Sequence, residues 1–240
     1  MNFLILGCSW AVPNYYGGLM DPPDTHTEYL LRSHGHNVIN CGKNNGSNLE
    51  SLDRAKRYLA GEQIPHPAIV KHNGIINIKK PSTIPWNIKK GPGATNIDWV
   101  IWFQCDYLRD FKNVPSSGTN RIETVARHTF QEYKKFVESI GSKLALIGGP
   151  MDFFPVYQEY FTPDFVVPSW NSSILGIQPE HHNIDDPEFE MQFMERQLHW
   201  QRLKTNSPYF PDGSHPGATA HADLVEKLLE CATNVNSQKN

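Results

Sequence analysis

Short apolar runs that alternate with amphipathic stretches are the feature that most constrains the fold of this chain. Such runs are typical of strands buried on both faces of a parallel sheet, and four of them cover residues 2–6, 37–40, 98–103 and 143–147. A weaker fifth run covers residues 164–167 and is stopped by Pro168. Since strands that alternate with helices favour a parallel sheet covered on both faces, we expect one α/β domain with three α/β/α layers and a flavodoxin-like sheet of about five strands.

Between these runs, apolar residues recur at the three- and four-residue spacing of helices. The clearest pattern covers residues 120–140 and is ended by Gly141. The sequence Thr25-His26-Thr27-Glu28 predicts a capping box at the start of a helix that Gly35 closes. Further helices are expected over residues 48–59, 188–203 and 218–231, and the polar residues from about 234 onwards predict a frayed tail.

Two long segments interrupt this alternation. Residues 10–24 form a loop after the first strand, and residues 62–96 hold five lysines, one glutamate and five prolines. Structureless loops of this length are unusual, so we predict an ordered insertion, with a His-Asn-Gly turn at 72–74 that favours a hairpin over 68–79. Its lysines favour either a solvated basic surface or the steering of an anionic substrate or partner. Residues 1–240 are expected to form a single domain.

Composition excludes several classes of protein. The chain has 240 residues, 4 cysteines and a formal net charge of −3. Sparse cysteines without a C-x-x-C pair argue against a disulfide scaffold or a zinc knuckle, and the charge argues against general affinity for nucleic acid or an anionic membrane. No run approaches the roughly 18 apolar residues of a membrane span, and the N-terminus lacks the basic region of a signal peptide. We therefore expect a soluble, cytoplasmic protein, whose oligomeric state the sequence leaves open.

Polar residues gather where the predicted strands end. Ligands of open parallel sheets bind beyond the carboxyl ends of the strands, so these residues are the first candidates for a site. The first strand is followed by Gly7-Cys8-Ser9-Trp10, and the third by Gln104-Cys105-Asp106-Tyr107-Leu108-Arg109. The second strand is followed by Asn40-Cys41-Gly42-Lys43-Asn44-Asn45-Gly46-Ser47-Asn48, and the last helix is preceded by Asp212-Gly213-Ser214-His215-Pro216.

Taken together, these four blocks resemble those of the SGNH (GDSL-type) hydrolase family, in the family's order and over residues 3–228. Gly-Cys-Ser-Trp stands where the family has Gly-Asp-Ser, and Asp-Gly-Ser-His-Pro matches its Asp-x-x-His-Pro block. The resemblance implies a serine ester hydrolase in which Ser9 is the nucleophile, His215 the base and Asp212 the carboxylate that orients the imidazole. The divergent second and third blocks are similar to those of phage-encoded members.

The residue types suit these roles. A serine is a poor nucleophile until a base accepts its proton, and Asp212 lies three residues before His215, so one turn can bring the carboxylate to the imidazole. Each residue also has a structural alternative when it is considered alone. Ser9 could cap a turn, His215 could be a surface residue at a helix start, and Asp212 could accept hydrogen bonds there.

The oxyanion hole is where the chain departs from the family. The expected donors from the first two blocks are the backbone N–H of Ser9 and that of Gly46, with Asn45 adjacent. The family's asparagine donor in the third block aligns with Cys105, whose S–H is a weak donor, and Gln104 is a possible substitute. Loss of one donor costs about 10²–10³ in rate, so the pattern also fits a slow enzyme or one that has lost catalysis.

Arg109 and Trp10 complete the candidate site. Arg109 either binds a substrate carboxylate or phosphate or, as we favour, pairs with Asp106 or Asp110 to lock its loop. Trp10 belongs to a group of aromatic residues expected near the candidate nucleophile, where rings can stack on sugars or cover acyl groups. The other members of this group are Tyr15, Tyr16, Phe153, Phe154 and Trp170.

Cys8, Cys41 and Cys105 each follow one of the first three predicted strands. We favour the interpretation that these small side chains pack under the site loops. Two alternatives remain open: a redox-sensitive thiol beside the nucleophile, and a soft-metal site completed by a histidine.

The function expected from these residues is hydrolysis of an ester with a short acyl group, such as acetyl on a carbohydrate. The reaction would proceed through an acyl-enzyme and would need no metal and no organic cofactor. The alternative is an SGNH-fold binding or structural module with impaired catalysis. A flavodoxin-like nucleotide-binding protein is disfavoured, because no glycine-rich phosphate loop follows the first strand.

Overall fold

A computed structural model provides the fold of the chain. It describes residues 1–12, 14–16, 25–44, 46–65, 69–71, 87–88, 96–105, 107–111, 114, 121–148, 158–176, 188, 191, 195, 199, 202–203, 207, 209–210 and 215–237.

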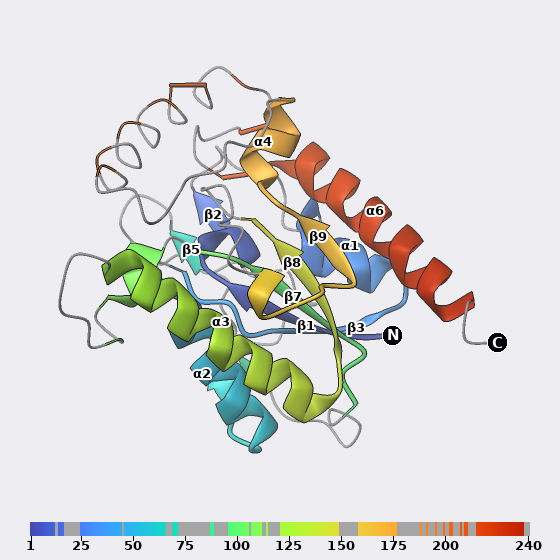
Figure 1. The fold of residues 1–240 in the computed structure, drawn as a ribbon. Helices are drawn as coiled ribbons and strands as arrows, with labels where there is room; N and C mark the ends of the chain where they lie inside the picture. Colours follow the sequence, from blue (N-terminus) through green and yellow to red (C-terminus); the bar gives the residue numbers. More distant parts are fainter. Residues whose placement is uncertain are drawn as a thin grey trace.

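A five-stranded sheet forms the middle layer, and its neighbouring strands are all parallel (Figure 1). The strand order is β3-β1-β7-β8-β9. In sequence order along this sheet that is 2-1-3-4-5, the flavodoxin-like order, so the predicted fold class is confirmed. The five strands are β1 (Asn2–Gly7), β3 (Asn37–Asn40), β7 (Trp99–Phe103), β8 (Lys143–Ile147) and β9 (Phe165–Val167).

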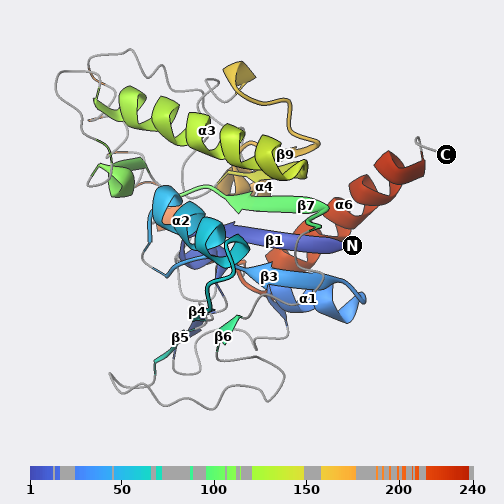
Figure 2. The same cartoon turned by 90° about the horizontal axis from the view of Figure 1, so that it is seen from below.

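Helices cover both faces of this sheet (Figures 1 and 2). The helices α2 (Asn48–Leu59) and α3 (Arg121–Ile140) pack on one face, and α1 (Thr27–Ser33), α4 (Trp170–Leu175) and α6 (Ala218–Ser237) pack on the other. The result is the predicted three-layer architecture.

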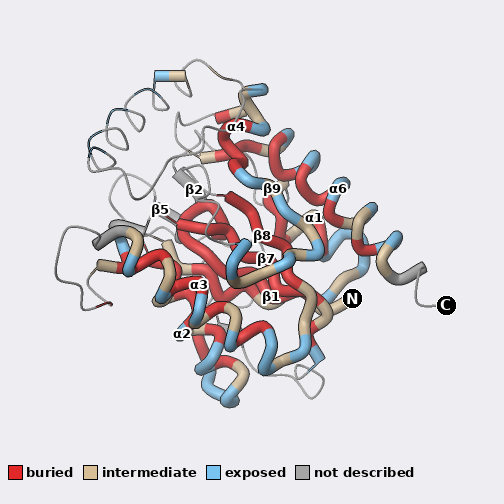
Figure 3. Tube along the Cα trace, viewed as in Figure 1, coloured by how far each residue is buried: buried red, intermediate tan, exposed pale blue. Residues whose placement is uncertain are grey.

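The central strands are hydrophobic on both sides because both of their faces are covered. In β1, Leu4 and Leu6 pack with α2 and α3, whereas Phe3 and Ile5 pack with α1 and α6. All four side chains have no exposed area, and burial of each contributes about 1.5–3 kcal/mol. Figure 3 shows that the sheet is buried and that the outer faces of the helices are exposed.

Helix ends follow the sequence signals in most places. Gly35 and Gly141 have φ values of +79° and +63°, in the left-handed region that glycine adopts without strain, and they stand directly beyond α1 and α3 as predicted. The capping box predicted at residues 25–28 is wrong. The N-cap of α1 is His26, whose side chain accepts from the Glu28 N–H, while the Glu28 carboxylate is buried against Arg32.

Two further helix predictions need correction. The helix α6 continues to Ser237 instead of giving way to a frayed tail, because Leu228 and Ala232 still pack against the sheet. The helix α4 was not predicted; Ser169 caps its start, and its six residues are too few for an apolar period to be recognised. Most of the helix predicted over 188–203 lies outside the described residues.

The insertion has secondary structure of its own. The strand β2 (Asn14–Tyr16) pairs in parallel with β5 (Ile69–Lys71), and β4 (Ile64–Pro65) pairs antiparallel with β6 (Asn87–Ile88). One partner of β5 therefore comes from the loop after β1. The hairpin predicted within 68–79 stays a prediction, because most of its residues lie outside the described part of the chain. Among the described helices, none is long and apolar enough to cross a membrane.

Candidate active site

The candidate nucleophile sits on a tight turn at the end of the central strand β1. Gly7 has φ +137°, and a Cβ atom there would lie 2.3 Å from the carbonyl oxygen of Phe103, so only glycine fits at this point. Cys8 follows, and Ser9 then opens a single 3₁₀ turn, η1 (Ser9–Ala11). The backbone N–H of Ala11 donates to Cys8 O at 3.0 Å and closes the turn. Ser9 is 7% exposed at the carboxyl end of the sheet.

His215 lies on the same side of the sheet, directly before α6, and is half-buried. His215 is near enough to two buried groups, the thiol of Cys8 and the imidazole of His221, to have a minor electrostatic effect on the pKa of each. Asp212, the expected orienting carboxylate, lies outside the described residues.

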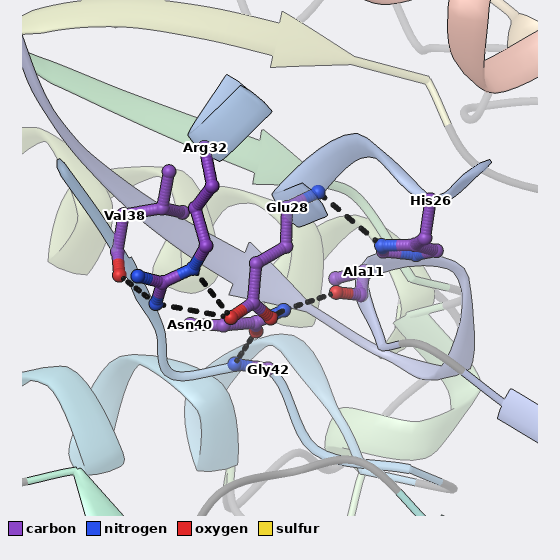
Figure 4. A network of polar contacts seen from close by, with 7 residues as sticks. All are labelled: Ala11, His26, Glu28, Arg32, Val38, Asn40 and Gly42. Carbon is purple, nitrogen blue, oxygen red and sulfur yellow. Dashed lines mark hydrogen bonds and ion pairs between the residues drawn. The ribbon is translucent and has the colours of Figure 1, made fainter. Parts of the chain in front are cut away.

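A buried asparagine fastens the turn of Ser9 to two neighbouring segments. Asn40 Nδ2 donates to Ala11 O at 2.7 Å and to Glu28 Oε2 at 3.0 Å, and its Oδ1 accepts from Gly42 N at 2.9 Å (Figure 4). Glu28 is 1% exposed and also accepts from the guanidinium of Arg32 at 3.2 Å. Asn40 thus holds η1, α1 and the loop after β3 in one arrangement.

Two buried histidines support this turn from the side of α1 and α6. His26 Nε2 lies 3.3 Å from Trp10 O, and the ring of His26 lies 4.2 Å from that of His221. His221 Nδ1 lies 2.8 Å from the hydroxyl of Thr27. Burial lowers the pKa of His221 well below its ordinary value, so this imidazole is neutral at pH 7. Sequence reasoning missed both histidines, and the inward position of His221 on α6 was the available signal.

The glycine loop between β3 and α2 is closely bonded to the end of β1. Lys43 N–H donates to Gly7 O at 2.9 Å, and Gly46 N–H donates to Lys43 O at 2.9 Å. The amide expected to face the oxyanion is therefore engaged in a turn of its own loop, and the role of Gly46 N–H in the oxyanion hole stays a prediction. Asn45 lies outside the described residues.

Asn48 is the first residue of α2, and its buried side chain joins the start of this helix to the segment that follows β7. Its Oδ1 accepts from Trp102 Nε1 at 3.1 Å and from Cys105 N at 2.7 Å. Its Nδ2 donates to Cys105 O at 3.2 Å and to Asp110 Oδ2 at 2.8 Å. All of its polar capacity is used, so the amide positions the end of β7 and is not free to bind substrate.

In the segment that follows β7, the side-chain amide of Gln104 is the candidate donor for an oxyanion. Cys105 is 3% exposed, its thiol bonds to Cys8 and its backbone N–H bonds to Asn48, so its expected place in the oxyanion hole is wrong in this conformation. Gln104 is 4% exposed, and among the residues that the structure describes its Nε2 has no hydrogen-bond partner. A buried donor without a partner costs about 1–3 kcal/mol, which is compatible with a group kept for a ligand.

Of the roles expected for Arg109, the structure allows only its pairing with Asp110 to be judged. It lies in the 3₁₀ turn η3 (Tyr107–Asp110), its side chain is exposed, and its Nη1 is 3.5 Å from Gly46 O. Asp110 is not its partner: one carboxylate oxygen accepts from Leu49 N and the other from Asn48 Nδ2, at the start of α2. Burial raises the pKa of Asp110. Asp106 lies outside the described residues.

Trp10 is part of the core and does not face a ligand. It is 4% exposed, and its ring packs edge-on against Trp170 at 5.7 Å and tilted against Phe210 at 6.4 Å. The turn after β1 directs this large side chain into the layer beneath α4 and α6, and a substrate contact through Trp10 stays a prediction. The side chains of Tyr15 and Tyr16 lie outside the described part.

The three cysteines of the site do not converge on one point. Cys8 and Cys105 belong to the core on the α1 and α6 face of the sheet, and Cys41 belongs to the core on the α2 and α3 face. The described residues contain no group of three or more metal-binding side chains. Packing beneath the site loops is thus what the structure describes for all three thiols.

Comparisons with known proteins add no functional information. No protein-family model matches the chain, and no curated protein matches it. A solved structure aligns with 98% of this chain and 96% of its own, at 13% sequence identity and a TM-score of 0.45. An alignment this distant carries no argument, so the resemblance to SGNH hydrolases stays a prediction from the four sequence blocks.

Proposed function

We propose that this protein is a serine ester hydrolase of SGNH type that acts on short acyl esters. Ser9 attacks the acyl carbonyl, His215 takes the serine proton and returns it to the leaving alcohol, and Asp212 orients the imidazole. Water then releases the acyl group from Ser9. The observation that supports the proposal is the turn that presents Ser9 at the carboxyl end of the sheet, with His215 near enough to have a minor electrostatic effect on the preceding residue, Cys8.

The rigid surroundings of Ser9 support this role. The adjoining turn is fixed by the buried side chain of Asn40 on Ala11 O and by His26 near Trp10 O. A nucleophile held on a fixed turn loses little freedom when it reacts, which is the structural requirement for an efficient attack. None of these contacts requires the hydroxyl of Ser9 itself.

The oxyanion would be stabilised by a modified set of donors. Gln104 Nε2 is the donor we assign to the third block, because Cys105 and Asn48 are committed to one another and the Gln104 amide is not. Gly46 N–H could join only if its bond to Lys43 O opened. We therefore propose that the hole relies on Gln104 and the turn of Ser9.

The limited exposure of Ser9 favours a small acyl group. Ser9 is 7% exposed, and so small an accessible area suits acetyl better than a long chain. Whether the alcohol is a sugar is best tested directly, by comparing acetylated monosaccharides with p-nitrophenyl acetate.

The test is covalent labelling with a fluorophosphonate together with turnover of p-nitrophenyl acetate. We expect the wild type to be labelled on Ser9, and Ser9→Ala and His215→Ala to lose labelling and turnover. Matched controls are Ser142→Ala and His34→Ala, which alter a serine bonded to Ile97 O before β8 and an exposed histidine after α1. Both controls should behave as the wild type.

Two results would overturn the proposal. Equal labelling of Ser9→Ala would exclude Ser9 as the nucleophile. A folded wild type that is neither labelled nor active on the ester panel would favour the alternative of an SGNH-fold binding module.

A further inference from the structure

Two buried cysteines meet beside Ser9 and have no part in the proposed ester hydrolysis. Cys8 follows β1 and Cys105 follows β7, and these strands are hydrogen-bonded neighbours with Gly7 opposite Phe103. Both side chains belong to the same apolar core, and the two thiols are hydrogen-bonded to each other. Both are free thiols in the structure.

The two cysteines meet at one edge of the sheet, beyond a pair of neighbouring strands. Gly7 pairs with Phe103 across β1 and β7, and Cys8 and Cys105 come one and two residues beyond this pair. The turn at Gly7 carries the Cys8 side chain out of the strand alternation and into the core on the α1 and α6 face, where Cys105 also packs. Two thiols in hydrogen-bond contact have the arrangement from which a disulfide can close.

The surroundings make the two thiols chemically unequal. The hydrogen bond from Cys105 lowers the pKa of Cys8 to about 6, with help from the Trp10 N–H and the positive charges of Arg109 and His215. Burial, together with that same bond, raises the pKa of Cys105 well above its ordinary value. The lowered pKa of Cys8 and the raised pKa of Cys105 favour Cys8 as the attacking cysteine and Cys105 as the resolving one.

We propose that Cys8 and Cys105 form a redox-sensitive pair that a peroxide converts into a reversible disulfide between the ends of β1 and β7. The Cys8 thiolate attacks one peroxide oxygen, the O–O bond breaks, and the departing hydroxide takes up a proton to become water. The sulfur of Cys105 then attacks the resulting sulfenic acid, the S–S bond forms, and a second water leaves with the proton of Cys105. Two thiols are oxidised, and one peroxide is reduced to two waters.

Cys41 provides an internal comparison for this reaction. It also follows a strand of the sheet, but it packs on the opposite face, has no exposed area, and burial raises its pKa to about 12. Cys8 is 2% exposed and Cys105 is 3% exposed, whereas Cys41 has no exposed area. This small exposure suits an oxidant the size of water. Oxidation should therefore select the pair.

The experiment is titration of the full-length folded protein with hydrogen peroxide, followed by denaturation in an alkylating agent and mass spectrometry. Trypsin places Cys8, Cys41 and Cys105 in three separate peptides, residues 1–32, 33–43 and 91–109. We expect the wild type and Cys41→Ser to lose about 2 Da, to yield the linked peptides 1–32 and 91–109, and to recover with dithiothreitol. Cys105→Ser should gain about 16 Da at Cys8, as a sulfenic acid that dimedone traps.

A linked pair that includes Cys41, a Cys8 oxidised without a link in the wild type, or a Cys8 that does not react would each overturn the proposal. If Cys105→Ser does not fold, the linked peptides found in the wild type and in Cys41→Ser are sufficient to test the proposed disulfide. The mass measurement does not depend on esterase activity, so failure of the proposed function and failure of this inference are separate results.

Discussion

Asn48 holds the backbone of Cys105 with two hydrogen bonds, accepting from Cys105 N at 2.7 Å and donating to Cys105 O at 3.2 Å. Through this contact the first residue of α2 fixes the point where β7 ends and the third block of the site begins. The same side chain also bonds to the indole of Trp102 and the carboxylate of Asp110, so one amide joins three buried groups.

Asn48→Ala should therefore be strongly destabilising. The substitution leaves the Cys105 N–H, the Trp102 indole N–H and the Asp110 carboxylate without this partner in a buried region, and we expect a loss of about 3–5 kcal/mol in the free energy of unfolding. Chemical denaturation measures it. The control is Asn37→Ala, which removes an exposed bond to Asn2 and should cost less than about 0.5 kcal/mol. A loss below about 1 kcal/mol for Asn48→Ala would contradict this role of Asn48.

Gly7→Ala tests the turn that carries Ser9. Gly7 and Gly61 both have positive φ, +137° and +95°, but a Cβ at Gly7 would lie 2.3 Å from Phe103 O, whereas nothing lies within 4 Å at Gly61. Gly61→Ala should cost about 1 kcal/mol from backbone strain alone. Gly7→Ala must in addition separate β1 from β7, so we expect a loss at least about 2 kcal/mol larger by thermal or chemical unfolding. Equal losses of stability in Gly7→Ala and Gly61→Ala would show that Gly7 does not stay close to the carbonyl oxygen of Phe103.

The fold could be predicted from the sequence because its signals are local and redundant. The central strands β1, β7 and β8 are buried and consist of short apolar runs, and glycines such as Gly35 and Gly141 stand at helix ends. The errors occurred where a local pattern competed with a long-range contact. Glu28 looked like the acceptor of a capping box, but its carboxylate bonds to Asn40, twelve residues away.

The candidate site was less predictable, because the roles of its polar residues depend on partners far along the chain. Asn48 and Cys105 are 57 residues apart, and nothing in either block alone indicates that they saturate one another. Trp10 was expected at a ligand, yet a 3₁₀ turn directs it into the core. The position of Ser9 at the carboxyl end of the sheet follows from the parallel-strand topology, which is why its place directly after the first apolar run could indicate it.

His221 predicts a specific dependence of stability on pH. Burial keeps its pKa in the folded state well below 6.5, while the unfolded chain takes up a proton near that value. Below pH 6.5 the unfolded state therefore binds more protons, and the folded protein loses up to about 1.4 kcal/mol per pH unit from this group as the pH falls. Above pH 6.5 the contribution is constant.

The measurement is urea denaturation between pH 5 and 7.5 for the wild type and His221→Asn, whose amide can replace Nδ1 beside Thr27. The wild type should lose stability more steeply than the variant below pH 6.5, and the two curves should run parallel above it. Parallel curves over the whole range would mean that His221 is protonated within the fold.

The Gln104→Met variant tests whether the side-chain amide of Gln104 binds the oxyanion or supports the fold. If Nε2 is kept for the oxyanion, its removal should lower kcat for p-nitrophenyl acetate by about 10²–10³ with little change in KM. Because that nitrogen has no partner among the described residues, the free energy of unfolding should fall by less than about 1 kcal/mol or rise. Gln131→Met, on the exposed side of α3, is the control and should change neither quantity. An unchanged kcat together with a clear loss of stability would place Gln104 in the scaffold and not in the site.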